Sequence, residues 1–263
     1  MTYLRLVRLF AGASIQNELA YSANFWLSLL HSLLNLATGV LGLVVIFGQV
    51  ETVHGWDFAS TLALLGVYLS LNALRGLVLG PSLEALAGMD GEVWSGRLDF
   101  TLLRPVDIQF LASLRYWRPL ALVDLALGMV VLGLALRQLG LTLTLVQLLT
   151  FGLTLLAAVA ILYAILLAFT GLVFWSPGFL FTWVFDAFFQ MARYPVGLYP
   201  GWLRLILTWI IPVGLMTTVP AQALTGALSG QMLFGSLALA GVLLCGASAL
   251  FRFGLRRYSS ASS

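Results

Sequence analysis

The chain has 263 residues, of which 61% are hydrophobic and only 9% are charged, and its formal net charge is +3. A soluble protein of this length carries about a quarter of its residues as charged ones, and a mean hydropathy of +1.01 is incompatible with a soluble fold. Apolar stretches of eighteen or more residues recur, each long enough to cross about 30 Å of hydrocarbon as a helix. The composition predicts an all-α polytopic membrane protein.

The positive charge comes entirely from arginine, because the chain contains no lysine. A GxxxxGK[ST] phosphate loop is therefore absent, and Schiff-base chemistry is excluded. Two histidines and one cysteine are too few for a convincing metal site, and no GxSxG or HExxH motif occurs. The arginines are dispersed at the ends of apolar blocks, so no nucleic-acid partner is expected. We expect neither an enzyme nor a chain that binds a cofactor or metal itself.

Residues 1–22 mix Arg5 and Arg8 with apolar residues, which is typical of an amphipathic helix lying in the membrane interface. The alternative is a frayed start to the first span. We predict six spans within a single membrane domain of residues 1–263. They cover residues 23–47, 59–81, 112–136, 144–173, 178–193 and 231–252.

An even number of spans places both termini on one side of the membrane. That side, with the loop after the second span, holds nine of the arginines, and the other side holds three. Because arginine is enriched in cytoplasmic loops, both termini are predicted to be cytoplasmic. The arginine-only basic usage and the high Ala, Leu and Gly content indicate the compositional bias of a GC-rich bacterium. We expect the chain in a bacterial cytoplasmic (inner) membrane.

The first span carries a polar stripe whose members recur every three or four residues and therefore share one helix face. Polar groups rarely face lipid, so the stripe faces either neighbouring helices or a water-accessible path. Both interpretations stay open; His31 alone is more typical of a packing histidine than of a proton relay. As a translocation path, the stripe comprises Asn24, Ser28, His31, Asn35 and Thr38.

Charges inside the predicted spans need partners, because an isolated charge in hydrocarbon is costly. Arg75 in the second span and Asp124 in the third lie at similar depths, about six residues or ~9 Å from the same boundary, which predicts an intramembrane charge pair. The alternative is that Arg75 reaches the interface along its own stem. Asp186 in the fifth span is a weaker candidate to pair with Arg193 on the same helix.

Residues 194–230 are apolar but interrupted by prolines. Proline inside a helix removes a hydrogen bond and clashes with the preceding turn. The segment therefore predicts short, bent or re-entrant helices rather than one more continuous span. Its candidate residues are Pro195, Tyr199, Pro200, Trp202, Pro212 and Pro220.

The longest predicted cytoplasmic loop, residues 82–107, ends in the charged string GRLDFTLLRPVD at 96–107. Its first part, from Ser82 to Trp94, could form a short helix. A solvated connector is the plainer alternative, but side chains such as Phe100 and Leu103 are too apolar for a free loop. Apolar side chains interleaved with arginine and aspartate are typical of a protein-docking surface, and arginine suits bidentate pairing with carboxylates of a partner.

Two stretches, in this order, resemble the type-2 branch of the six-helix ABC exporter permeases. SGRLDFTLLRPVDIQF at 95–110 is similar to the cytoplasmic signature G-x-L-D-x-x-L-x-R-P of that branch. RYPVGLYPGWLRLILTWIIPVGLMTTVPAQALTG at 193–226 is similar to its proline-punctuated segment before the last helix. The resemblance covers essentially the whole chain.

The resemblance implies an amino-terminal interfacial helix, six transmembrane helices and external re-entrant helices at 194–230. It implies a non-catalytic permease subunit of an ATP-driven exporter, with ATP and Mg²⁺ on separate ABC ATPase subunits and with a second permease copy or a related permease as partner. An ion-gradient-driven secondary transporter or channel is the alternative function. A coupling role in 82–107 carries over to Glu92, Gly96, Asp99, Arg104 and Pro105, and their neighbours Trp94, Arg97 and Asp107 complete the predicted set.

Overall fold

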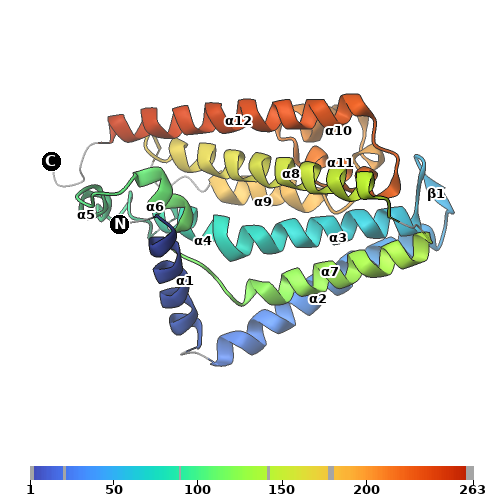
Figure 1. Ribbon diagram of the computed structural model, residues 1–263, viewed down its shortest axis with the longest axis horizontal. Coiled ribbons are helices and arrows are strands. Elements are labelled where there is room, and N and C mark those ends of the chain that lie inside the picture. The colour runs from blue at the N-terminus through green and yellow to red at the C-terminus, as the bar shows by residue number, and fades with distance from the viewer. Residues whose placement is uncertain (1–2, 20–21, 89, 141–142, 177–180, 259–263) are drawn as a thin grey trace.

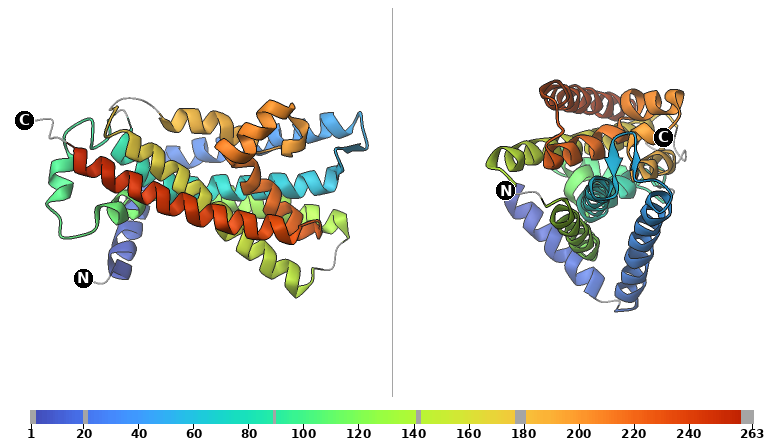
Figure 2. Two further views of the ribbon diagram at one scale, coloured as in Figure 1. Left: turned by 90° about the horizontal axis from the view of Figure 1, so that it is seen from above. Right: turned by 90° about the vertical axis from the view of Figure 1, so that its right-hand side faces the viewer.

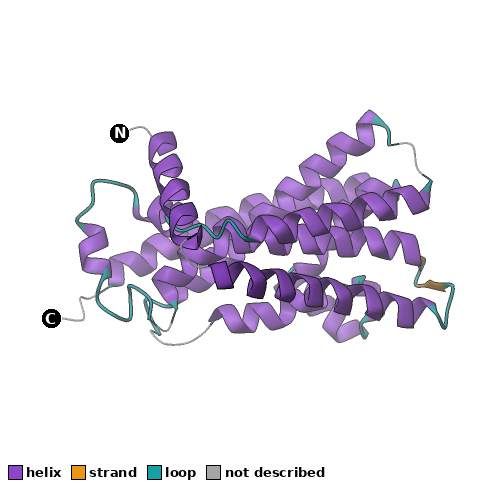
Figure 3. Cartoon of the chain, turned by 90° about the horizontal axis from the view of Figure 1, so that it is seen from below, coloured by secondary structure: helices purple, strands orange, loops and turns teal. Residues whose placement is uncertain are grey.

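The structure is a computed structural model that describes residues 3–19, 22–88, 90–140, 143–176 and 181–258. Long helices run side by side along one axis, and the loops gather at the two ends of this bundle (Figures 1 and 3). Helix α1, Tyr3–Leu19, lies across one end of the bundle, where helix α12, Gly230–Arg257, also finishes. The first helix and the end of the last helix thus lie at the same end of the bundle.

Five helical stretches in the described chain are long and apolar enough to cross a membrane, in agreement with a polytopic all-α protein. They are Phe25–Phe47 in α2 (Ser22–Phe47), Phe58–Ala87, Ala121–Leu139 (α7), Leu145–Leu172 (α8) and Gly230–Arg257 (α12). A sixth candidate is a bent pair, Gly201–Ile210 with Val213–Thr225, whose two arms meet at 86°.

The second span is longer than predicted. Helix α3, Phe58–Leu74, continues through a π-helical turn, η1 (Arg75–Leu79), into α4 (Gly80–Ala87). Pro81 does not end the helix at the predicted residue 81, because it lies in the first turn of α4, where a missing N–H costs little. The first residues of the predicted loop are therefore helical.

The predicted third span, 112–136, is divided into α6 (Ile108–Leu114) and α7 (Ala121–Leu139). The connecting residues include Pro119, and the residue before a proline disfavours helical backbone. The N–H of Arg118 instead donates to the carbonyl of Leu77 at 3.0 Å. The third membrane helix thus begins at residue 121 rather than 112.

The predicted fifth span, 178–193, contains only the 11-residue helix α9, Phe181–Met191, within the described residues. A helix of this length covers about 16 Å, roughly half of the hydrocarbon thickness. Residues 178–180 lie outside the described part of the chain. The helix ends just before Pro195, which cannot continue a helical hydrogen-bond ladder.

A short hairpin closes the opposite end of the bundle and starts α3. Strands β1 (Thr52–Val53) and β2 (Trp56–Asp57) pair antiparallel, and Asp57 then caps the helix, accepting a hydrogen bond from the N–H of Ser60 at 2.8 Å. This cap satisfies one of the free N–H groups of the first turn. The position where the second span begins is therefore fixed locally.

Helix α3 lies near the centre of the bundle when it is viewed along its long axis (Figure 2, right). In the most apolar part of the span Phe58–Ala87, to which α3 belongs, 67% of the residues are buried. The corresponding share is 17% for α2 and for α12. Helices α2 and α12 therefore present apolar side chains outward, as expected for helices that face lipid or another membrane chain.

Helices α3 and α7 approach each other closely through two glycines. A β-carbon on Gly66 would lie 2.9 Å from the backbone nitrogen of Leu132, and one on Gly128 would lie 2.9 Å from that of Ser70. Membrane helices associate largely by close packing, because lipid tails are as apolar as their side chains. The two glycines are thus part of what holds α7 to the centre of the bundle.

We expect Gly66→Ala to lower the thermal stability of the purified chain, by about 1–3 kcal/mol, because the new methyl group has no space against α7. Gly133→Ala on α7 is the matched control, since no atom lies within 4 Å of a β-carbon at that position. Differential scanning fluorimetry in detergent compares the two. Equal melting temperatures for both variants would contradict this packing.

Candidate functional site

The predicted coupling segment, residues 82–107, begins on α4 and continues through turns at 90–97 into α5 (Leu98–Leu102). The helix expected from Ser82 to Trp94 ends earlier, at Ala87, because Gly88 takes extended backbone with ψ 177°. Gly96 allows a second change of direction, with φ at +70°, a conformation that side-chain-bearing residues rarely adopt. The segment is thus a folded structure at the end of the bundle.

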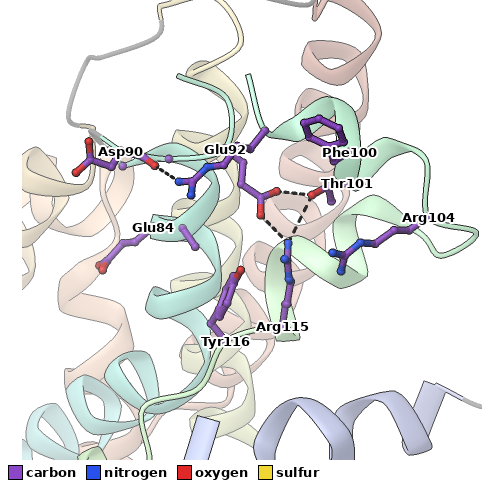
Figure 4. A pocket seen from close by; sticks show the side chains of 12 residues that line it. Glu84, Asp90, Glu92, Phe100, Thr101, Arg104, Arg115 and Tyr116 are labelled. Atoms are coloured by element: carbon purple, nitrogen blue, oxygen red, sulfur yellow. Dashed lines mark hydrogen bonds and ion pairs between the residues drawn. The ribbon is translucent and has the colours of Figure 1, made fainter. Parts of the chain in front are cut away.

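Glu92 lies inside this structure and holds it together (Figure 4). Its carboxylate forms an ion pair with Arg115, with Oε1 and Nη1 2.6 Å apart, and its Oε2 accepts a hydrogen bond from the hydroxyl of Thr101 at 2.6 Å. Glu92 lies in the turns, Arg115 at the end of α6 and Thr101 in α5. Because Glu92 is only 9% exposed, the structure places this predicted coupling residue beneath the surface rather than on it.

Five residues of the segment form what we call the loop surface: Trp94, Arg97, Phe100, Leu103 and Arg104. They are exposed, and the three apolar side chains are strongly so, at 58% for Trp94, 72% for Phe100 and 81% for Leu103. Arg97 is oriented by hydrogen bonds from its guanidinium to the carbonyl of Asp90 and the hydroxyl of Ser95. Apolar and cationic groups thus lie together on a fixed scaffold.

A hollow of about 400 Å³ lies beside the loop surface (Figure 4). Arg97, Phe100 and Arg104 line it, together with the acidic residues Glu84 and Asp90. Both signs of charge therefore lie around the hollow.

The remaining predicted coupling residues have local structural contacts. Asp99 lies beside Tyr258, after the end of α12; burial, and then the neighbouring Asp99 carboxylate, raise the pKa of the Tyr258 phenol. Asp107 caps α6 and accepts a hydrogen bond from the N–H of Phe110 at 2.9 Å. Pro105 is exposed between them. The segment is therefore joined to both α6 and α12.

Helix α1 is attached to the segment that precedes α7. The hydroxyl of Ser14 accepts a hydrogen bond from the N–H of Trp117 at 3.1 Å, and the carboxylate of Glu18 accepts one from the N–H of Leu120 at 2.8 Å. The ring of Tyr3 also contacts that of Phe110, with centroids 4.7 Å apart. Sequence reasoning predicted the helix in 1–22 but not these contacts, since they join residues about 100 positions apart.

Arg75 does not pair with Asp124 as predicted. Its guanidinium lies 2.5 Å from the carboxylate of Asp186 and 3.8 Å from that of Glu84. Asp124 lines the same polar cavity, of about 320 Å³, so the two residues lie near each other but the predicted partner was wrong. The prediction failed because the depth of a residue along a helix does not say which neighbouring helix its side chain faces.

The polar stripe of the first span has two roles. Ser28, His31 and Asn35 line the same cavity as Arg75. Asn35 and Thr38 also accept hydrogen bonds from Arg193, so Arg193 contacts α2 rather than Asp186 as expected. The side chain of Asn24 lies outside the described part of the chain. Three of the four described members of the stripe thus line a polar cavity, and two, Asn35 and Thr38, bond to Arg193.

The proline-rich segment forms short helices, as predicted. Pro195, Pro200 and Pro212 immediately precede η2 (Val196–Leu198), α10 (Gly201–Leu205) and α11 (Val213–Thr225). A π-helical turn, η3 (Ile206–Ile210), separates α10 from the bend before α11. Pro220 lies inside α11, Trp202 is exposed, and the hydroxyl of Tyr199 donates to the carbonyl of Met191.

No group of three or more His, Cys, Asp or Glu residues in the described ranges could hold a metal ion. The titratable side chains that do gather, around Glu92 and around Arg75, are paired as ions. In both places the charged groups are neutralised by a partner within the chain.

We expect Glu92→Gln to loosen the coupling segment, because Arg115 would then be largely buried without a counterion, which costs about 3 kcal/mol. Hydrogen exchange of the amides between residues 90 and 104 should accelerate. Asp90→Asn, which removes an exposed charge from the same turn, is the control and should leave these amides unchanged. Unaltered exchange in Glu92→Gln would show that the ion pair does not hold the segment.

Comparison with known proteins identifies the family. The sequence model of the ABC-2 family transporter proteins matches residues 33–262, nearly the whole chain. No curated protein and no solved structure matches it. The match confirms the resemblance inferred from residues 95–110 and 193–226. This chain belongs to the ABC-2 transporter family and is a multi-pass membrane permease subunit of an ABC transporter.

Proposed function

We propose that the chain is half of the translocation path of an ATP-driven exporter, and that its loop surface docks a separate ATPase subunit. The observation that carries the proposal is the loop surface itself, where three exposed apolar side chains and two arginines stand on a scaffold fixed by Glu92. Aromatic residues and arginine dominate the energetics of protein interfaces. On this proposal ATP and Mg²⁺ are bound by the ATPase and not by this chain.

The orientation of the chain in the membrane follows from the position of the loop surface. The loop surface, α1 and the end of α12 lie at one end of the bundle, whereas α10 and the hairpin lie toward the other (Figure 1). Arginines concentrate at the first end, which the positive-inside rule assigns to the cytoplasm. We infer cytoplasmic termini in a bacterial inner membrane, an interfacial α1, and an external position for the bent helices of 194–230.

Two connections would carry motion from a docked ATPase into the membrane: a continuous helix and a pair of hydrogen bonds. Helix α4 bears the start of the coupling segment and is continuous with α3 at the centre of the bundle. Helix α1 is bonded through Ser14 and Glu18 to the segment that begins α7. A push on the loop surface would therefore move α3 and α7 together, which are themselves closely packed.

The polar cavity between α2, α4, α7 and α9 supports a path that a second permease completes. Helix α2 is largely exposed along its length and yet carries the exposed polar residues His31 and Thr38. Exposed polar side chains on a membrane helix are costly against lipid. We therefore place α2 against a second permease copy or a related permease.

Replacing Leu103 by Asp together with Arg104→Glu should abolish co-purification of the ATPase and stimulation of its hydrolysis, because both the apolar contact and the positive charge are lost. Arg137→Glu, an exposed arginine on α7 near the other end of the bundle, makes the same charge change and should retain the ATPase. The measurement is affinity purification of the tagged chain with mass spectrometry and an ATPase assay. Full ATPase retention by the double variant would overturn the assignment of this surface.

Thr38→Cys on α2, in a Cys245→Ser background, should give a covalent dimer when membranes are treated with a short bismaleimide. Leu149→Cys on α8 is the control, since Leu149 is also exposed but lies on another helix. Gel electrophoresis under reducing conditions distinguishes the cross-linked dimer from the monomer. Dimers from Leu149→Cys and none from Thr38→Cys would place the second permease elsewhere.

A further inference from the structure

A second groove, distinct from the loop surface and from the polar cavity, lies between α6, α8 and α12. It has a volume of about 580 Å³, within the range of ligand pockets in proteins. Two charged residues, Asp107 and Arg252, line it together with an apolar wall. The apolar wall consists of Leu114, Leu156, Val159, Ala160 and Leu244.

Polarity changes along the groove in the direction of the bundle axis. Arg252 lies five residues before the end of α12, and Asp107 starts α6 at the same end of the bundle. Leu244 lies eight residues earlier on α12, which is about 12 Å deeper into the membrane helix. The groove therefore has a charged opening near the end of the bundle and an apolar floor toward the middle of the bundle.

A connected set of hydrogen bonds fixes the wall between these two parts. The hydroxyl of Ser113 donates to the carbonyl of Gln109 at 2.6 Å, so the hydroxyl of Tyr163, 2.7 Å away, must donate to Ser113. Tyr163 can then only accept, and the amide nitrogen of Gln109 donates to it at 3.2 Å and to Ser248 at 3.0 Å. The hydroxyl groups of Ser113 and Tyr163 are thus occupied with one another, whereas Gln109 Oε1 is buried without a partner among the described residues. The groups of this wall that are left to bind a ligand are therefore this acceptor and the two charges.

The charges at the opening have opposite signs and do not neutralise each other. Neither Asp107 nor Arg252 takes part in an ion pair found among the described residues. Arginine binds phosphate oxygens well, and a carboxylate accepts hydrogen bonds from a primary ammonium group. A ligand that carries both groups on an apolar tail matches the groove in charge and in polarity.

We propose that this groove binds one phospholipid whose headgroup combines a phosphate with a primary ammonium. The phosphate contacts Arg252, the ammonium donates to Asp107, and an acyl chain lies along Ala160 and Leu244. A lipid fits better than a protein partner, because the apolar floor is formed by two membrane helices, and α12 is largely exposed. The site does not depend on ATPase docking, and its test requires no ATPase.

The test uses the full chain in detergent micelles that contain equal amounts of dioleoyl phosphatidylethanolamine, phosphatidylglycerol and phosphatidylcholine. Native mass spectrometry counts the lipids that stay bound. We expect one retained phosphatidylethanolamine, favoured about tenfold over the other two, since phosphatidylglycerol lacks an ammonium and the quaternary ammonium of phosphatidylcholine has no N–H to donate.

Matched variants separate the contacts. Arg252→Gln should lower retention of all three lipids, whereas Arg256→Gln, on the same helix but outside the groove, should not. Asp107→Asn keeps a residue that caps α6 equally well and should remove the preference for phosphatidylethanolamine over the other two lipids. Ala160→Phe should fill the groove and exclude every lipid.

Three results would overturn the proposal. The first is equal retention of the three lipids by the unaltered chain, and the second is retention that Arg252→Gln leaves unchanged. The third is an Ala160→Phe variant that alters the ratio of monomer to dimer in the same spectra without altering the lipid count, which would make the groove a protein interface.

Discussion

The cost of an unpaired polar or charged group in hydrocarbon governs this structure. Arg75 lies in a membrane helix and is tolerated because Asp186 and Glu84, from α9 and α4, surround its guanidinium. Arg193 is accommodated similarly by Asn35 and Thr38 of α2 and by the ring of Tyr68. In each case a short or bent element is held against a long one, so the positions of α9 and α2 relative to α3 follow from where these charges find partners.

The same requirement separates the surfaces of the molecule. Charges that pair inside the chain, such as Glu92 and Arg115, hold its structure together. Charges without an ion pair among the described residues, such as Arg104 and Arg252, are exposed to other molecules. The loop surface and the lipid groove differ in what accompanies those free charges. Exposed aromatic and leucine side chains beyond the membrane end suit a protein, whereas an apolar floor along α8 and α12 suits an acyl chain.

Much of this was predictable because it depends on local chemistry. The apolar blocks at 144–173 and 231–252 became α8 and α12 with small shifts, and the prolines at 195, 200 and 212 begin the short helices that they predicted. The prediction failed where a break was subtle: Pro119 divides the third span, whereas Pro81 does not end the second. Hydropathy alone cannot distinguish these two prolines, since what matters is whether the preceding backbone can adopt the conformation that each requires.

The sequence by itself determined the class of the protein and its family, because apolar block length and the two motifs at 95–110 and 193–226 are properties of contiguous residues. It also located the exposed apolar and arginine side chains of the coupling segment. Only the tertiary structure decided that Arg75 pairs with Asp186, that Glu92 is buried against Arg115, and that Asp107 and Arg252 share one groove. These contacts join residues that are 23 to 145 positions apart, and which faces of the helices meet is fixed by packing in three dimensions rather than by any local pattern.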